Sequence, residues 1–210
     1  MKKVKFEDSK IDFLLPSWTD LQDLTFQLAK KIKVKKVKID RLVTLAKGGW
    51  PMSRLLIDFL KLEKFASLGI RFYKGIDKKL SKPFIYQNIP VSIYKETVLL
   101  FDDVADSGFS LKFAKEYLEN NGAKKIITAT LFYKPTSSIE PDFWVFKTSS
   151  WIIFPYEIRE SIELLFNEWK NKGLSFKEIK DRFLKLGFKN QVINEFLESS
   201  SVIGDKKILH

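Results

Sequence analysis

The sequence predicts an α/β protein with a central, mostly parallel sheet flanked by helices, followed by an all-helical C-terminal part. Short apolar runs alternate with segments of helical periodicity through most of the chain. Glycines and polar turns separate these segments. After about residue 156 only amphipathic helical patterns remain, so we predict a core at residues 1–156 and a helical extension at residues 157–210.

Two strands and two helices are predicted in the first part of the chain. The first helix has Leu21, Leu24 and Leu28 at helical spacing. A glycine turn at residues 47–49 separates the first strand from the second helix. In order, the segments are a helix from about residue 17 into Lys30–Lys38, a strand over Arg41–Ala46, a helix over Met52–Leu62 and a strand over Phe65–Tyr73.

The next segment, Lys74–Pro90, has no clear period and predicts a long loop, with a short hairpin as the alternative. Apolar runs and helical spacing then resume, and they predict a strand, a turn, a helix, a strand, two short strands and three helices. These are Thr97–Phe101, Asp102–Gly108, Ser110–Asn120, Lys125–Tyr133, Trp144–Phe146, Trp151–Phe154, Glu157–Lys172, a helix capped at Ser175–Glu178, and one around Val192–Leu197.

The composition limits the chemistry that is available. The chain has 210 residues, no cysteine and a single histidine, His210. This argues against disulfides, cysteine-based metal sites and a Ser-His-Asp triad, and it leaves carboxylates, lysines and tyrosines for acid–base chemistry. No apolar run is long enough for a bilayer and the start lacks an apolar signal core, so we expect a soluble cytoplasmic protein.

The charge balance is strongly basic, with 37 Lys and Arg against 26 Asp and Glu and a formal net charge of +11. One interpretation is a polyanionic partner, either nucleic acid or a phosphorylated small molecule. The other is a solvated, lysine-rich surface. We favour the second, because the basic residues are spread from Lys2 to Lys207 instead of forming one block.

The segment Val98–Leu111 carries the main functional signal. Its apolar start predicts a buried strand, and open α/β sheets bind ligands at the carboxyl ends of such strands. Asp102 and Asp103 follow, and they can accept hydrogen bonds from two ribose hydroxyls or lie near Mg²⁺. The turn then offers backbone N–H groups and hydroxyls at a helix N-terminus, which suit a phosphate. The residues expected there are Ser107, Gly108, Phe109 and Ser110.

This whole segment resembles the signature of type I phosphoribosyltransferases that binds 5-phosphoribosyl 1-pyrophosphate (PRPP). The resemblance implies the fold of that family, with a small hood beside the core, and transfer of the phosphoribosyl group to a purine base with release of pyrophosphate. It also implies that Asp106 is the catalytic group near N7 of the purine, and that Asp102, Asp103 and Glu157 help to hold Mg²⁺.

Lys47, Gly48 and Gly49 stand where this family has its pyrophosphate-binding loop, and the resemblance implies a cis Ala46–Lys47 peptide. Tyr73–Pro83 matches the family's flexible catalytic loop in position. Three lysines of that loop are therefore candidates to neutralise pyrophosphate, and ordinary solvation is the alternative for each. They are Lys74, Lys78 and Lys79.

Two later segments, Leu131–Pro135 and Trp151–Glu157, resemble the base-binding hood of purine phosphoribosyltransferases. The resemblance implies that Trp151 stacks on the purine and that backbone groups of Ile152 reach the edge of the base. It places Lys134 beside position 6 of the ring. Packing in the core is the alternative role for Trp151.

The sequence signals disagree on the identity of the purine. Lys134 has only hydrogen-bond donors, which suit the O6 of guanine, hypoxanthine or xanthine better than the amino group of adenine. The chain with its extension, however, resembles adenine phosphoribosyltransferases of certain archaea, and the typical 6-oxopurine form has a polar residue where Phe109 stands. We therefore expect adenine as substrate and AMP as product, with a 6-oxopurine enzyme as the alternative.

A transcriptional regulator that senses PRPP without using it is the second alternative, favoured by the helical extension and the basic charge. The pyrophosphate loop and the hood count against it. The extension also lacks a dense basic stripe, so we do not expect a nucleic-acid partner. Its apolar stripe, which includes Ile162, Leu165 and Trp169, has to be buried, and we expect a homodimer.

Overall fold

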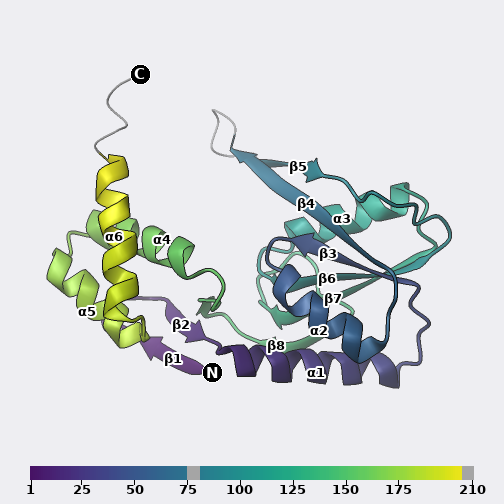
Figure 1. The fold of residues 1–210 in the computed structure, drawn as a ribbon, viewed down its shortest axis with the longest axis horizontal. Coiled ribbons are helices and arrows are strands. Elements are labelled where there is room, and N and C mark those ends of the chain that lie inside the picture. The colour runs from purple at the N-terminus through teal and green to yellow at the C-terminus, as the bar shows by residue number, and fades with distance from the viewer. Residues whose placement is uncertain (75–80, 205–210) are drawn as a thin grey trace. The chain divides into compact units, whose positions relative to one another are not determined.

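Figure 1 shows the computed structural model, which describes residues 1–74 and 81–204, with the backbone alone for residues 73, 74, 81, 82 and 198–204. The chain forms two compact units. The larger one is Thr19–Ser149, and the smaller one joins Met1–Trp18 with Ser150–His210. Among the described residues, no helix is long and apolar enough to cross a membrane.

The larger unit is built on a six-stranded sheet, and the predicted α/β class is confirmed. Every neighbouring pair of strands is parallel except the β4–β5 hairpin, which is antiparallel. In spatial order the strands are β5 (Ser81–Gln87), β4 (Phe65–Lys74), β3 (Arg41–Ala46), β6 (Thr97–Ala105), β7 (Lys125–Tyr133) and β8 (Phe143–Lys147).

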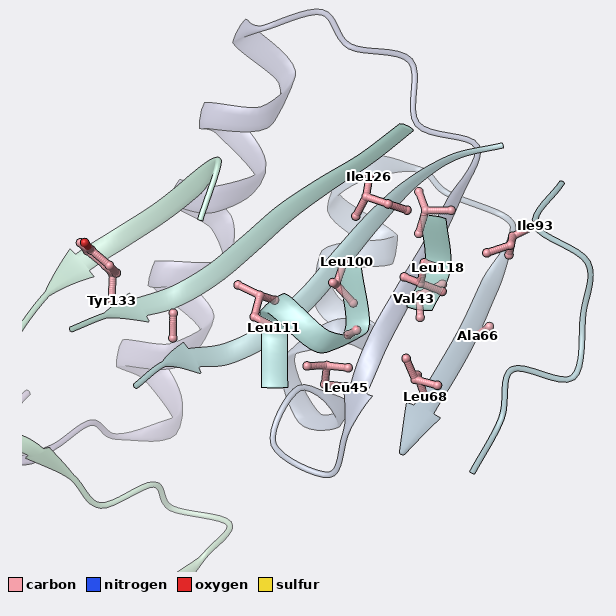
Figure 2. Close-up of a cluster of buried hydrophobic side chains, with 13 residues drawn as sticks. Val43, Leu45, Ala66, Leu68, Ile93, Leu100, Leu111, Leu118, Ile126 and Tyr133 are labelled. Carbon is pink, nitrogen blue, oxygen red and sulfur yellow. The ribbon is translucent and has the colours of Figure 1, made fainter. Parts of the chain in front are cut away.

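Helices cover both faces of this sheet (Figure 1). α1 (Trp18–Val34) and α2 (Trp50–Leu60) lie on one face, and α3 (Phe109–Asn120) lies on the other. β3, β6 and β7 are buried on both faces over most of their length, and their sequences are correspondingly rich in consecutive apolar residues. Figure 2 shows the core beneath α3, where Leu111 and Leu118 pack over strand residues such as Leu100.

Three features of the larger unit differ from the sequence prediction. β6 continues through Asp102 and Asp103 to Ala105, because its pairing with β7 runs on to Tyr133, so the carboxylates lie in a strand and not in the turn. The segment predicted as a long loop contains β5, which makes the alternative, a hairpin, correct. α2 begins at Trp50, immediately after the glycine turn and two residues earlier than predicted.

The smaller unit combines a three-stranded sheet with the predicted C-terminal helices. The capping box at Ser175 and Glu178 is present. The strands β1 and β2 were not predicted, because four-residue strands give little periodicity. The elements are β1 (Lys2–Lys5), β2 (Asp12–Leu15), β9 (Trp151–Ile152), α4 (Ile158–Asn171), α5 (Phe176–Leu186) and α6 (Asn190–Gly204), with the sheet order β1-β2-β9.

An aromatic core joins the strands of the smaller unit to its helices. The rings of Phe6 and Phe13 lie 5.7 and 6.3 Å from that of Trp169, which is buried in α4. Arg182 of α5 lies over Phe6 and forms an ion pair with Asp8 at 2.6 Å. The structure therefore groups the N-terminal hairpin with the helical extension, whereas the sequence placed the boundary at residue 156.

Candidate functional site

The C-terminal end of β6 holds two adjacent carboxylates that differ in exposure. Asp102 is half-buried, and its Oδ1 accepts a hydrogen bond from the Asp103 N–H at 3.0 Å. Asp103 is only 5% exposed. Its carboxylate lies against Gly48, where a Cβ atom would stand 2.6 Å from Oδ2. The structure thus brings the predicted ribose-binding and pyrophosphate-binding segments into contact.

The turn after β3 is closely packed and needs its glycines. The Ala46–Lys47 peptide is cis, as the resemblance implied. A Cβ atom on Gly49 would lie 2.3 Å from the Thr44 hydroxyl and 3.1 Å from the carbonyl oxygen of Phe101, so this position excludes any side chain. Lys47 is exposed at the tip of the turn. Its backbone and ammonium group can both approach an anion above β3 and β6.

The turn after β6 leads directly into the N-terminus of α3. Gly108 has a left-handed φ of 78°, and a Cβ atom there would lie 2.3 Å from the Ser137 hydroxyl. The Ser138 N–H donates to the Ser107 carbonyl at 2.9 Å, which fixes the turn from the other side. α3 begins at Phe109 without a side-chain cap and without an acidic residue in its first turn. This arrangement suits a phosphate at the helix N-terminus.

Two residues that the sequence assigned to different roles form an ion pair. Lys134 Nζ lies 2.7 Å from Asp106 Oδ2, with the lysine side chain 13% exposed and the aspartate 61% exposed. The Lys134 N–H donates to the Ala105 carbonyl at 3.0 Å, which places the residue beside the end of β6. The candidate catalytic carboxylate and the candidate base-recognition residue therefore act as a pair.

The other residues that the sequence predicted for the site belong to β9, to the start of α4 and to the segment after β4. Trp151 and Ile152 form β9 of the smaller unit, and Glu157 precedes α4, where its N–H donates to Phe154. Lys74 ends β4, but its side chain and both Lys78 and Lys79 lie outside the described residues.

The two carboxylates at the end of β6 suit a magnesium ion that is bound jointly by the protein and by phosphate groups of the substrate. Mg²⁺ in such sites takes one or two protein carboxylates and fills its other positions with phosphate oxygens and water. Asp102 and Asp103 supply two carboxylates at one strand end. Within the described part of the chain, no group of three or more His, Cys, Asp or Glu residues could hold a metal by itself.

Sequence reasoning missed three residues near the site. Thr44 has a fully buried hydroxyl beneath Gly49, and this hydroxyl has no hydrogen-bond partner among the described residues. Ser137 and Ser138 pack on the turn at Gly108. The run of small polar residues after Lys134 was the available signal for the serines, but only the parallel pairing of β6 with β7 brings them to Gly108.

Comparison with known proteins supports one family. The family model of the phosphoribosyl transferase domain matches residues 17–160. A purine phosphoribosyltransferase from Pyrococcus horikoshii Ot3 is 32% identical, with a TM-score of 0.62 over 69% of this chain and 93% of its own. A Helicobacter pylori xanthine-guanine-hypoxanthine phosphoribosyltransferase has the same fold at 20% identity and a TM-score of 0.59, covering 72% and 96% of the two chains. No curated protein sequence matches the chain.

Proposed function

The chain belongs to the phosphoribosyltransferase family of glycosyltransferase-type enzymes, and from this premise we propose that it transfers the 5-phosphoribosyl group of PRPP to N9 of adenine. The products would be AMP and pyrophosphate. The contact between Asp103 and Gly48 carries the proposal, because it joins a sugar-binding segment to an anion-binding turn at the ligand-binding edge of the sheet.

We assign each part of PRPP to a group of the larger unit. The N-terminus of α3 would take the 5-phosphate, Asp102 and Asp103 the ribose hydroxyls, and the turn at residues 47–49 the pyrophosphate. Mg²⁺ bound by PRPP and these carboxylates would neutralise charge on the leaving pyrophosphate. The transition state has oxocarbenium character by analogy with other glycosyl transfers, so carboxylates near the sugar and cations near the leaving group both favour it.

Asp106 is the proposed proton acceptor at the purine. The Lys134 ammonium, whose Nζ lies 2.7 Å from Asp106 Oδ2, holds the Asp106 carboxylate in one position, and a general base must be held within reach of the proton that it accepts. On the family resemblance alone, Trp151 is proposed to stack on the purine, Ile152 to bind its edge and Glu157 to assist with Mg²⁺. The side chains of the loop lysines Lys74 and Lys78 are proposed to contact pyrophosphate.

The ion pair gives Lys134 a role that does not depend on the base. In the proposal for adenine, the ammonium serves to hold Asp106 and makes no hydrogen bond to the 6-amino group, which offers it no suitable acceptor. A 6-oxopurine enzyme is the second candidate, since Lys134 would donate to O6 if the ion pair opened. The Pyrococcus relative is described only as a purine enzyme and favours neither base.

Steady-state assays with PRPP and each of adenine, guanine, hypoxanthine and xanthine test the proposal. We expect kcat/KM to be highest for adenine, and we expect Lys134→Gln to lower it for all four bases through the loss of the ion pair with Asp106. A clear preference for any 6-oxopurine would refute adenine. Absence of nucleotide formation, together with a salt-sensitive gel shift of duplex DNA, would favour the regulator. Sedimentation velocity would test the proposed homodimer.

A further inference from the structure

We propose that the larger unit has a second binding surface, for single-stranded RNA, at the end of the sheet where the parallel strands begin, opposite the PRPP site at their carboxyl ends. This surface, the basic edge, consists of residues 33–41, 61–64, 94–97 and 119–125, which lead into the strands β3, β4, β6 and β7. Because these strands are parallel, their amino ends lie at the same edge, away from the carboxyl ends that hold the candidate catalytic residues.

Backbone hydrogen bonds show that the four segments are side by side. The Leu42 N–H donates to the Lys64 carbonyl at 3.0 Å, and the Asp40 N–H donates to the Thr97 carbonyl at 2.9 Å. On the far side, the Lys124 N–H donates to the Glu96 carbonyl at 2.8 Å. Neighbouring strands lie about 4.8 Å apart, so the edge from β4 to β7 spans about 14 Å, which is the length of about four nucleotides at the 3.4 Å spacing of a stacked strand.

The basic edge brings together positively charged residues that are scattered between positions 33 and 125 of the sequence. Its four segments contain ten basic and four acidic residues. Some of these charges are used internally. Glu96 accepts from Arg41, which is buried, and from Lys64, at 2.7 Å each, and Asp40 accepts from the Thr97 N–H at 2.8 Å. Without Arg41 and Lys64, eight basic residues remain for a ligand. The basic members are Lys33, Lys35, Lys36, Lys38, Arg41, Lys61, Lys64, Lys95, Lys124 and Lys125.

Three of these lysines occupy backbone positions that favour glycine or asparagine. Lys36, Lys61 and Lys95 have φ values of 50°, 55° and 60°, and they are the only non-glycine residues with positive φ in the described chain. All three side chains are exposed, and none forms an ion pair with a described residue. Helix C-termini attract cations, which accounts in part for Lys36 and Lys61, but Lys95 follows no helix. A requirement for positive charge explains all three.

An exposed aromatic ring on the basic edge points to nucleic acid among the possible polyanions. Tyr94 is 66% exposed, and Lys95 Nζ lies 5.0 Å from the centre of its ring. The edge of the ring rests on Gly122, where a Cβ atom would lie 2.9 Å from Cδ2. Proteins that bind single strands combine a cationic track with such a ring, on which a base stacks. An acidic protein would use the charge without needing the ring.

The test compares two triple variants that lose the same charge. The edge variant replaces three lysines of the basic edge with asparagine, a residue that tolerates positive φ. Its substitutions are Lys36→Asn, Lys61→Asn and Lys95→Asn. Lys3→Asn, Lys177→Asn and Lys189→Asn, all exposed in the smaller unit, are the control. Fluorescence anisotropy with a labelled 20-nucleotide single-stranded RNA, at 50 to 200 mM KCl, measures the affinity of each.

We expect the full chain to bind this RNA and the edge variant to bind more weakly. Three lost phosphate contacts should reduce the slope of log K against log salt by about 2. Tyr94→Leu should weaken binding about tenfold. The Tm and the rate of nucleotide formation from PRPP should not fall in the edge variant, which separates this test from that of the proposed function.

Three results would overturn the proposal. One is no measurable binding to RNA at 50 mM KCl, and another is an equal loss in the control variant, which would indicate a nonspecific effect of net charge. The third is edge-dependent binding to vesicles of phosphatidylserine and phosphatidylcholine without binding to RNA, which would identify a lipid surface instead.

Discussion

Gly48→Ala tests the close approach of Gly48 to Asp103 in the candidate site without changing a backbone conformation that requires glycine. Gly48 does not have a positive φ, so alanine is not excluded there by backbone conformation. The new methyl group would instead meet the Asp103 carboxylate, with distances of 2.6, 2.8 and 2.9 Å to Oδ2, Oδ1 and Cγ. The perturbation is therefore steric and directed at one functional side chain.

The size of the effect follows from these distances. Ordinary contact begins at 3.4 Å, so the carboxylate must retreat by about 0.8 Å. Asp103 is 5% exposed, which leaves it little room, and overpacking of this kind costs about 1 to 3 kcal/mol of folding free energy. A catalytic group misplaced by about 1 Å can reduce turnover about 100-fold, and we expect a loss of kcat/KM for PRPP of that order.

Urea unfolding and steady-state kinetics measure the two consequences, and Gly173→Ala is the control. Gly173 has a φ of 85°, and no atom of a described residue lies within 4 Å of the place that an alanine methyl group would take, so alanine there should cost about 1 kcal/mol and leave the kinetics unchanged. The steric argument would be refuted if Gly48→Ala kept both its stability within about 0.5 kcal/mol and its kcat/KM for PRPP.

Three further substitutions test the fold. The guanidinium of Arg41, followed by the Lys64 ammonium, lowers the pKa of Glu96 despite its desolvation. Glu96→Gln should therefore cost about 2 kcal/mol of folding free energy at neutral pH. A carboxyl group whose pKa is lowered by folding stabilises the protein only when the pH is above its usual pKa, so the difference between the two proteins should shrink as the pH falls below about 4.3. Urea titrations at pH 7 and pH 3.5 measure this difference, and a constant difference would contradict the assignment. Thr44→Val removes a buried hydroxyl that has no hydrogen-bond partner in the described part of the chain. The Tm should therefore stay the same or rise, with a stability gain of up to about 1 kcal/mol, whereas a large loss would show that the hydroxyl is used. Ser175→Ala breaks the capping box of α5 and should destabilise the smaller unit by about 1 kcal/mol in thermal unfolding, while Ser175→Asp should retain most of the stability.

Features that depend on neighbouring residues could be predicted from the sequence. β3 and β7 have their predicted bounds, because continuous apolar runs bounded by turn residues are typical of strands buried on both faces. The capping box at Ser175 is equally local, since its two hydrogen bonds join residues three apart. The family resemblance of Val98–Leu111 belongs to the same class, because its residues form one continuous string.

The sequence by itself determined the α/β class, the extension and the segments that hold the candidate site. Only the tertiary structure decided which of these segments meet. Asp103 packs on Gly48, Lys134 pairs with Asp106, and lysines scattered between residues 33 and 125 share one edge, all through parallel pairing of distant strands. The physical reason is that register and strand order depend on contacts between residues far apart in the chain, which no local pattern of periodicity records.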